Sequence, residues 1–204
     1  MRIVELILDE DQEDAGIEAI SIVESPAIES DFVALKAEEI KLAEIDKDKR
    51  ILLGALLIPN KPIYRNGDEG DYYIFFSKDT IVKASQMYLK NGYQNNSTLE
   101  HAQALKGLTL VESWIVESET QDKSRKYGLN VPVGTWMGAV KVNNDEIWKE
   151  YVKTNKVKGF SIEGYFADKM ESPKEKVKEN MSKDEKILNE IINILTLDNE
   201  TKKQ

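Results

Sequence analysis

The chain has 204 residues, of which 41% are hydrophobic and 32% charged, and its formal net charge is −9. This composition is typical of a globular protein with a polar surface, and its acidity argues against a general nucleic-acid binder, whose phosphate contacts need clustered lysine and arginine. With a single histidine and no cysteine, the chain excludes a disulfide framework, a cysteine nucleophile and a zinc site built from histidine and cysteine.

The sequence pattern predicts neither a leader peptide nor a membrane-spanning segment. Residues 1–13 lack the basic and apolar regions of a leader peptide, and no later stretch approaches 18 apolar residues. We therefore expect a protein that is neither secreted nor membrane-spanning, and the absence of cysteine permits a reducing compartment.

The first half of the chain contains apolar runs separated by turn signals. Residues 1–10 are of strand length, although a short buried helix fits them equally well. Strands are predicted over 50–59 and 72–76, followed by a helix over 77–91 that Ser77 caps.

The second half repeats the strand pattern with one further helix. Strands are predicted over 108–117, 134–142 and 158–166, and a helix with an asparagine cap over 143–156. Strands with a few inserted helices, without a regular βαβ repeat, predict an α+β fold with a central barrel or sheet.

Past Phe166 the composition shifts to charged residues with few large apolar ones, which is typical of a linker. We predict one domain over residues 1–171, and over 172–204 a charged linker with an amphipathic helix. The apolar stripe of that helix, which calls for a partner, consists of Ile187, Leu188, Ile191, Ile192 and Leu195.

Three polar residues are candidates for chemistry. Ser161 alternates with Phe160 and Ile162 in a strand pattern and so points off the apolar face. His101 precedes the predicted strand over 108–117, in which Glu112 alternates with apolar residues and is expected to be partly buried. Each also has an ordinary explanation: a solvent-facing serine, a surface histidine and a structural ion pair.

Several blocks of the chain, in the same order, resemble the XkdF-type phage serine proteases, the prohead or capsid-maturation proteases of tailed phages. These blocks are GIEAISIVESPAIESDFVAL, LIPNKPIYR, YYIFFSKDTI, EHAQALKGLTLVESWIVE, DKSRKYGLNVPVGTWMGAVKV and EIWKEYVKTNKVKGFSIEGYF, within residues 15–168. The resemblance implies a herpesvirus-assemblin-like fold, a mainly antiparallel β-barrel with surrounding helices.

The resemblance also implies a serine endopeptidase that needs no cofactor or metal. Its nucleophile would be Ser161 and its general base His101. The expected substrates are phage scaffold and major capsid proteins, cleaved inside the assembling procapsid in the host cytoplasm, with self-association as a further expectation and no nucleic-acid or membrane partner. The alternative is a non-enzymatic scaffold or assembly factor of the procapsid.

The third catalytic position departs from the assemblin pattern, which uses a second histidine that this chain lacks. The candidates are Glu112, Glu163, a water or nothing. We expect Glu112, because residues on neighbouring strands reach hydrogen-bond distance more readily than residues i and i+2 of one strand, whose Cα atoms are about 6.6 Å apart.

Overall fold

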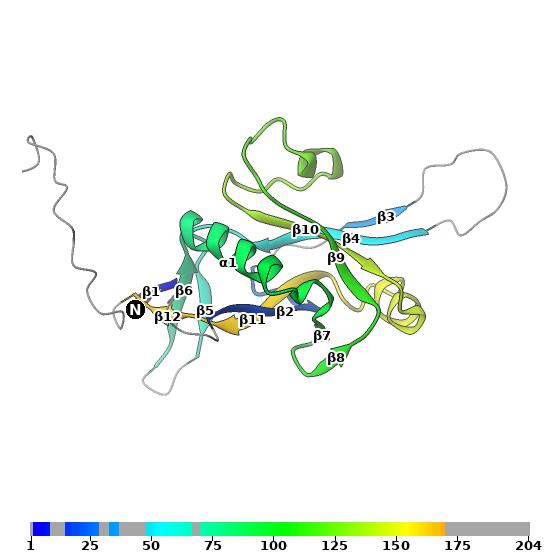
Figure 1. The fold of residues 1–204 in the computed structure, drawn as a ribbon, viewed down its shortest axis with the longest axis horizontal. Helices are drawn as coiled ribbons and strands as arrows, with labels where there is room; N and C mark the ends of the chain where they lie inside the picture. The colour runs from blue at the N-terminus through cyan, green and yellow to red at the C-terminus, as the bar shows by residue number, and fades with distance from the viewer. Residues whose placement is uncertain (1, 9–14, 29–32, 37–47, 67–69, 170–204) are drawn as a thin grey trace, which may run out of the picture. The chain divides into compact units, whose positions relative to one another are not determined.

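A computed structural model describes residues 2–8, 15–28, 33–36, 48–66 and 70–169, which belong to one compact unit over Met1–Glu171. The described strands form three four-stranded sheets (Figure 1). The predicted linker and the amphipathic helix over 172–204 lie outside the described residues.

The first sheet has the strand order β12-β1-β6-β5. Its long strands are apolar on the inner face, and Phe76 packs its ring edge-on against Phe166, with 4.9 Å between the ring centroids. The strands are β1 (Arg2–Ile7), β5 (Ile63–Arg65), β6 (Tyr72–Phe76) and β12 (Ala167–Asp168).

The second sheet, ordered β3-β4-β10-β9, contains much of the apolar core. In β10 six of seven residues are buried, as expected for the centre of a sheet covered on both faces. Its strands are β3 (Val33–Lys36), β4 (Asp48–Leu57), β9 (Leu108–Ile115) and β10 (Trp136–Val142).

The third sheet, ordered β11-β2-β7-β8, carries the candidate site. One face packs on the core through Ile20, Ile22 and Phe160, whereas the other carries the hydroxyl residues of the candidate site. Its strands are β2 (Gly16–Val23), β7 (Ser97–Leu99), β8 (Gln103–Leu105) and β11 (Gly159–Tyr165).

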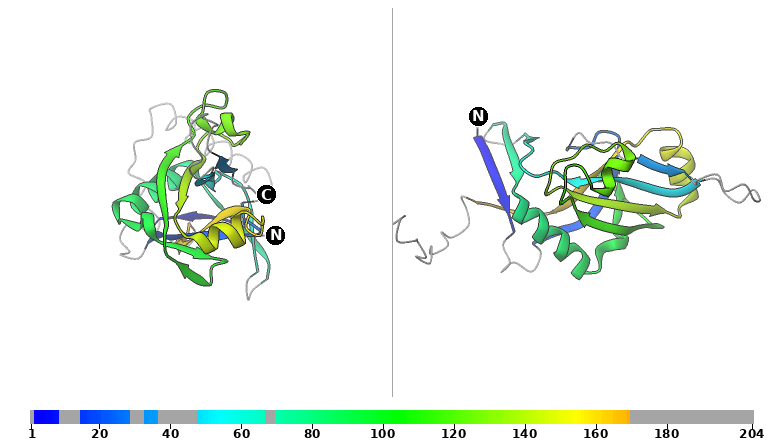
Figure 2. Two further views of the ribbon diagram at one scale, coloured as in Figure 1. Left: turned by 90° about the vertical axis from the view of Figure 1, so that its right-hand side faces the viewer. Right: turned by 90° about the horizontal axis from the view of Figure 1, so that it is seen from above.

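Helix α1 (Lys78–Lys90) runs along one side of the sheets (Figures 1 and 2). Ser77 caps it as predicted, because its Oγ accepts a hydrogen bond from Thr80 N at 3.4 Å. Tyr88, fully buried, packs edge-on against Trp136 and fastens the helix to the second sheet.

The remaining helical turns are short: η1 (Tyr93–Asn95), η2 (Lys123–Tyr127) and the π-helix η3 (Ile147–Val152). The helix predicted over 143–156 is thus shorter than expected, although Asn144 caps it, with Oδ1 accepting from Ile147 N at 3.1 Å.

The α+β content agrees with the sequence prediction. The pairing is mainly antiparallel, as expected, and among the described strand pairs only β1–β6 and β2–β7 are parallel. The predicted closed barrel is wrong for the described residues, where the three sheets stay open. Strands of three residues, such as β5, β7 and β8, offer too few ladder bonds to continue a barrel wall.

Candidate functional site

A row of small polar side chains crosses the third sheet. Ser161 on β11 is paired with Ser21 on β2, and Ser21 is paired with Thr98 on β7. Because directly paired residues project from the same face of a sheet, these three hydroxyl residues share its outer face. Glu163, two residues after Ser161 and paired with the small Ala19, lies on that face as well.

The lone histidine sits in the turn between β7 and β8 rather than at the entry to β9. Ala102 N donates to Leu99 O at 3.0 Å, and the two residues between them, Glu100 and His101, have φ values of 50° and 58°. Two successive positive φ values are characteristic of a type I′ turn, and without glycine each costs on the order of 1 kcal/mol. The surrounding contacts must therefore hold this turn in place.

Those contacts come from β2 and from Glu24, the residue that follows it. His101 N donates to Ser21 Oγ at 3.1 Å, and Glu24 N donates to the Glu100 carboxylate at 2.7 Å. Glu100 N in turn donates to Ile22 O at 3.2 Å. The turn is thereby fixed over the outer face of the sheet.

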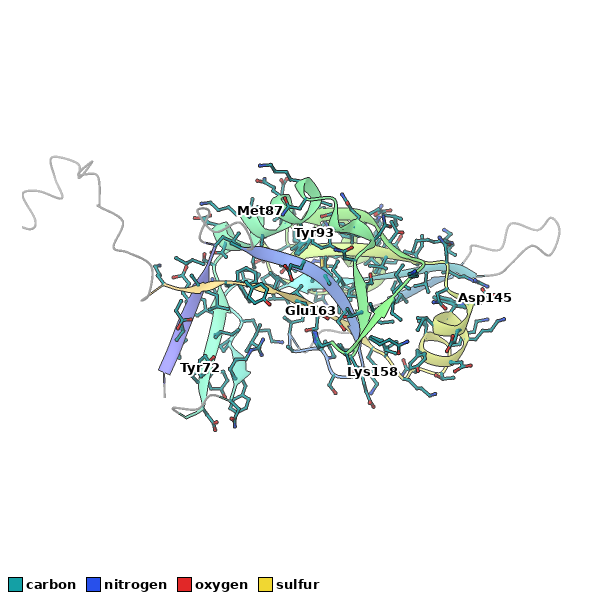
Figure 3. All side chains as sticks on the ribbon, turned by 60° about the horizontal axis from the view of Figure 1, so that its bottom comes forward. Tyr72, Met87, Tyr93, Asp145, Lys158 and Glu163 are labelled. Carbon is teal, nitrogen blue, oxygen red and sulfur yellow. The ribbon has the colours of Figure 1, made fainter. Side chains whose placement is uncertain are left out.

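His101 meets a carboxylate from the far strand of the same sheet. Its Nδ1 lies 3.1 Å from Glu163 Oε1, and the Thr98 hydroxyl donates to the same oxygen. Figure 3 labels Glu163 where β11 faces β2 and β7, and the small Ala19 and Ser21 on β2 leave room for its side chain to cross. With Nδ1 committed to the carboxylate, Nε2 is the ring nitrogen left for a substrate or a nucleophile.

Solvent access differs within this group. The side chains of His101 and Glu163 are 43% and 30% exposed, so small molecules can reach the imidazole. Ser161 is half-buried and lines a cavity of about 310 Å³, whereas Ser21 is fully buried. Of the two serines on this face, only Ser161 is accessible to a substrate.

The structure places Glu112 away from His101, contrary to the sequence expectation. Glu112 lies on β9 in the second sheet, is exposed, and forms an ion pair with Lys123. The two residues are separated because β9 belongs to a different sheet from β7 and β8, which flank His101. The exposure of Glu112 has a second cause, a β-bulge: Leu110 pairs with Val140 and Glu112 with Ala139, so Val111 is an extra residue. The bulge breaks the alternation on which the predicted burial depended, and Val111 and Glu112 both face solvent.

Three further residues of the site carry no signal in the sequence. Thr98 and Ser21 are ordinary strand hydroxyl residues, and Glu100 is a turn carboxylate. Their roles depend on pairings between segments about 80 residues apart, which local patterns do not reveal.

Gly164 shows why the β11 sequence has the form GFSIEGYF. A Cβ placed on Gly164 would overlap Gly16 O and lie 2.7 Å from Ile17 Cα, so only glycine fits against β2 there. The two strand backbones therefore approach closely at this position.

Within the described parts of the chain, no group of three or more His, Asp and Glu side chains is arranged to hold a metal ion. No helix among these residues is long and apolar enough to cross a membrane.

Ser161 thus shares a sheet face with the His101–Glu163 pair, and a serine, a histidine and a carboxylate are the groups that serine hydrolases use. The model of one protein family matches residues 38–171, and its description reads "Putative phage serine protease XkdF". The match spans more than half of the chain, and the protein belongs to this family of phage serine proteases. No curated protein and no solved structure shows a significant match.

Proposed function

We propose that the protein is a phage prohead protease, a serine endopeptidase that cleaves scaffold and capsid proteins during head assembly. Family membership supports the protease class. The observation that carries the catalytic assignment is the 3.1 Å contact of His101 Nδ1 with Glu163 Oε1, on the sheet face that also bears Ser161. The proposed roles are Ser161 as nucleophile, His101 as general base and Glu163 as the group that orients the imidazole.

In the first half of the reaction Ser161 Oγ attacks the scissile carbonyl while His101 Nε2 takes the hydroxyl proton. The tetrahedral intermediate collapses to an acyl-enzyme, and the imidazolium returns the proton to the departing amine. Glu163 keeps the ring proton on Nδ1 and stabilises the imidazolium without itself being protonated. Water, deprotonated by the same imidazole, then releases the acyl group.

Thr98 has a supporting role in this scheme. Its hydroxyl donates to the same Glu163 oxygen that faces His101, so it fixes the position of the carboxylate. Ser21 supports the backbone of the histidine turn in the same manner. Both act as positioning residues, since neither would touch the substrate.

The proposed partners follow from the capsid role. Scaffold and major capsid proteins are the substrates, reached when the protease is enclosed in the procapsid within the host cytoplasm, and copies of the chain are proposed to associate there. No nucleic acid or membrane is part of the proposal.

The test is co-expression of the full chain with scaffold and major capsid proteins from a phage that encodes a protein of this family, followed by mass measurement of the fragments. We expect discrete fragments from the wild type and none from Ser161→Ala. Ser118→Ala is the matched control, because Ser118 is half-buried like Ser161 but lies in the loop after β9, and it should process normally.

Identical fragments from the wild type and Ser161→Ala would show that Ser161 is not the nucleophile. If no fragment forms but capsids fail to assemble without the chain, the assembly-factor alternative is favoured.

A further inference from the structure

The cavity beside Ser161 borders β11 in an unusual way. Ser161, Ile162 and Gly164 all line it, together with Tyr165 and Phe166 beyond them. Neighbouring residues of a strand point to opposite faces, so a cavity on one face would meet only every second residue. Contact with consecutive residues means that the cavity runs along the edge of the strand.

That edge is open. β11 is the terminal strand of its sheet and, among the described residues, pairs only with β2 and, through Tyr165, with Ala15. A terminal strand presents backbone N–H and C=O groups on its outer side, where another chain can pair with them. We call this cavity along β11 the β11 groove.

The opposite wall of the β11 groove is apolar and deep. It is formed by side chains from β4, β5 and β6 that are at most 5% exposed: Leu56, Leu57, Ile63, Ile74 and Phe76. The polar lining residues Arg65 and Asp168 are more accessible than this wall. A cavity of about 310 Å³ whose deep wall is apolar and whose rim carries polar groups such as Arg65 and Asp168 has room for one apolar side chain against that wall.

From these observations we infer that the substrate binds as an extended strand along the outer edge of β11, with a large apolar side chain in the β11 groove. Because Ser161 lies on its wall, the residue filling the groove flanks the scissile bond. The inference rests on the proposed function and adds to it the substrate class: segments with leucine, isoleucine, methionine or phenylalanine at that position. This is recognition by strand addition, in which backbone pairing supplies affinity and the pocket supplies selectivity.

The first experiment incubates the full chain with a peptide library of random sequence and identifies the cleaved bonds by mass spectrometry. We expect one position beside the scissile bond to be enriched in the four large apolar residues. Ala27→Leu should weaken this preference, because Ala27 is exposed and lines the groove, so added carbons there narrow the groove without disturbing the core. For a leucine-containing peptide we expect kcat/KM to fall at least about tenfold, and for its alanine analogue much less.

Thr120→Leu is the matched control, since it adds bulk at an exposed residue outside the groove and should leave both peptides unaffected. A second measurement tests the strand pairing by methylating one backbone nitrogen of the leucine peptide at a time. Strand addition predicts that cleavage is lost at every second position.

The outcomes separate the two proposals. Cleavage that depends on Ser161, but without apolar preference or without an effect of Ala27→Leu, overturns the groove assignment and leaves the protease proposal standing. Methylation losses without a period of two overturn the strand mode of binding. Absence of cleavage in every library, together with no labelling of Ser161 by a fluorophosphonate, overturns both proposals.

Discussion

Strands β9 and β11 offer the same chemical groups in very different settings. Each carries a serine and a glutamate within three residues, Glu112 and Ser113 on β9 and Ser161 and Glu163 on β11. On β9 the glutamate pairs with Lys123 and the serine accepts a hydrogen bond from Trp136 Nε1 at 2.8 Å. On β11 the glutamate meets His101 and the serine borders a groove.

The comparison teaches that the neighbours of a residue define its role. In β9 both polar groups are used by the fold: Lys123 also lies 5.2 Å from the centroid of the Trp114 ring, so the ion pair covers an aromatic surface. Next to Glu163 of β11 lies the only histidine of the chain, which can exchange protons near neutral pH. Identical residue types thus serve structure in one sheet and are proposed to serve catalysis in the other.

The largest effect should come from the groups proposed to react. Ser161→Ala and His101→Ala should each lower kcat by about 10⁴-fold or more, and the double variant should be little worse, because the groups act as a unit. The measurement is single-turnover cleavage of a capsid-derived peptide, with thermal melting to verify folding. Additive losses in the double variant would contradict a shared mechanism.

The next effect separates the two glutamates. Glu163→Gln should lower kcat by on the order of 10²-fold with little change in melting temperature, because the amide no longer stabilises the imidazolium. Glu112→Gln should leave kcat unchanged and cost at most about 1 kcal/mol of folding free energy, since its ion pair is exposed. The reverse ranking would return the third role to Glu112.

Gly164→Ala should destabilise the fold by about 2 kcal/mol or more, because the new Cβ would overlap the β2 backbone. Gly128→Ala is the comparison: its Cβ would meet no atom within 4 Å, and its positive φ alone costs about 1 kcal/mol. Urea unfolding of both variants measures the difference. Equal losses would show that β2 moves aside without cost.

The smallest effect concerns the serine of β9. Ser113→Ala should retain full activity per folded molecule but lose about 1–3 kcal/mol of stability, because the buried Trp136 indole N–H is left without its partner. Activity and urea unfolding of the same preparation decide it. A loss of activity at unchanged stability would place Ser113 in the catalytic apparatus.

Much of the fold could be read from local patterns. The strand at 72–76 coincides with β6, and the Ser77 cap begins α1 as predicted. Long apolar runs and capping residues are local signals, so the sequence reports them directly. The three-residue strands β7 and β8 escaped prediction because so few residues define no period.

The candidate site was only partly predictable for the same reason. Ser161 and His101 came from family resemblance, and their catalytic roles remain predictions. Glu112 was expected on a strand beside His101, but β9 belongs to the second sheet and the histidine turn to the third, and the order of segments along the chain does not reveal to which sheet each strand is added. The expected partial burial of Glu112 is also absent, because the Val111 bulge interrupts the alternation in β9. The reach of Glu163 over β2 depends on the small Ala19 opposite it, which is a property of register.

By itself the sequence determined the chemistry available: one histidine, no cysteine, an acidic surface and a strand with a serine between glycines. Tertiary structure alone decided which carboxylate meets the histidine. His101 and Glu163 are 62 residues apart, and their contact requires the pairing of β11 with β2, of β2 with β7, and a strained turn held by Ser21. Such contacts depend on the register of distant strands, which is set by burial across the whole sheet and by no single segment.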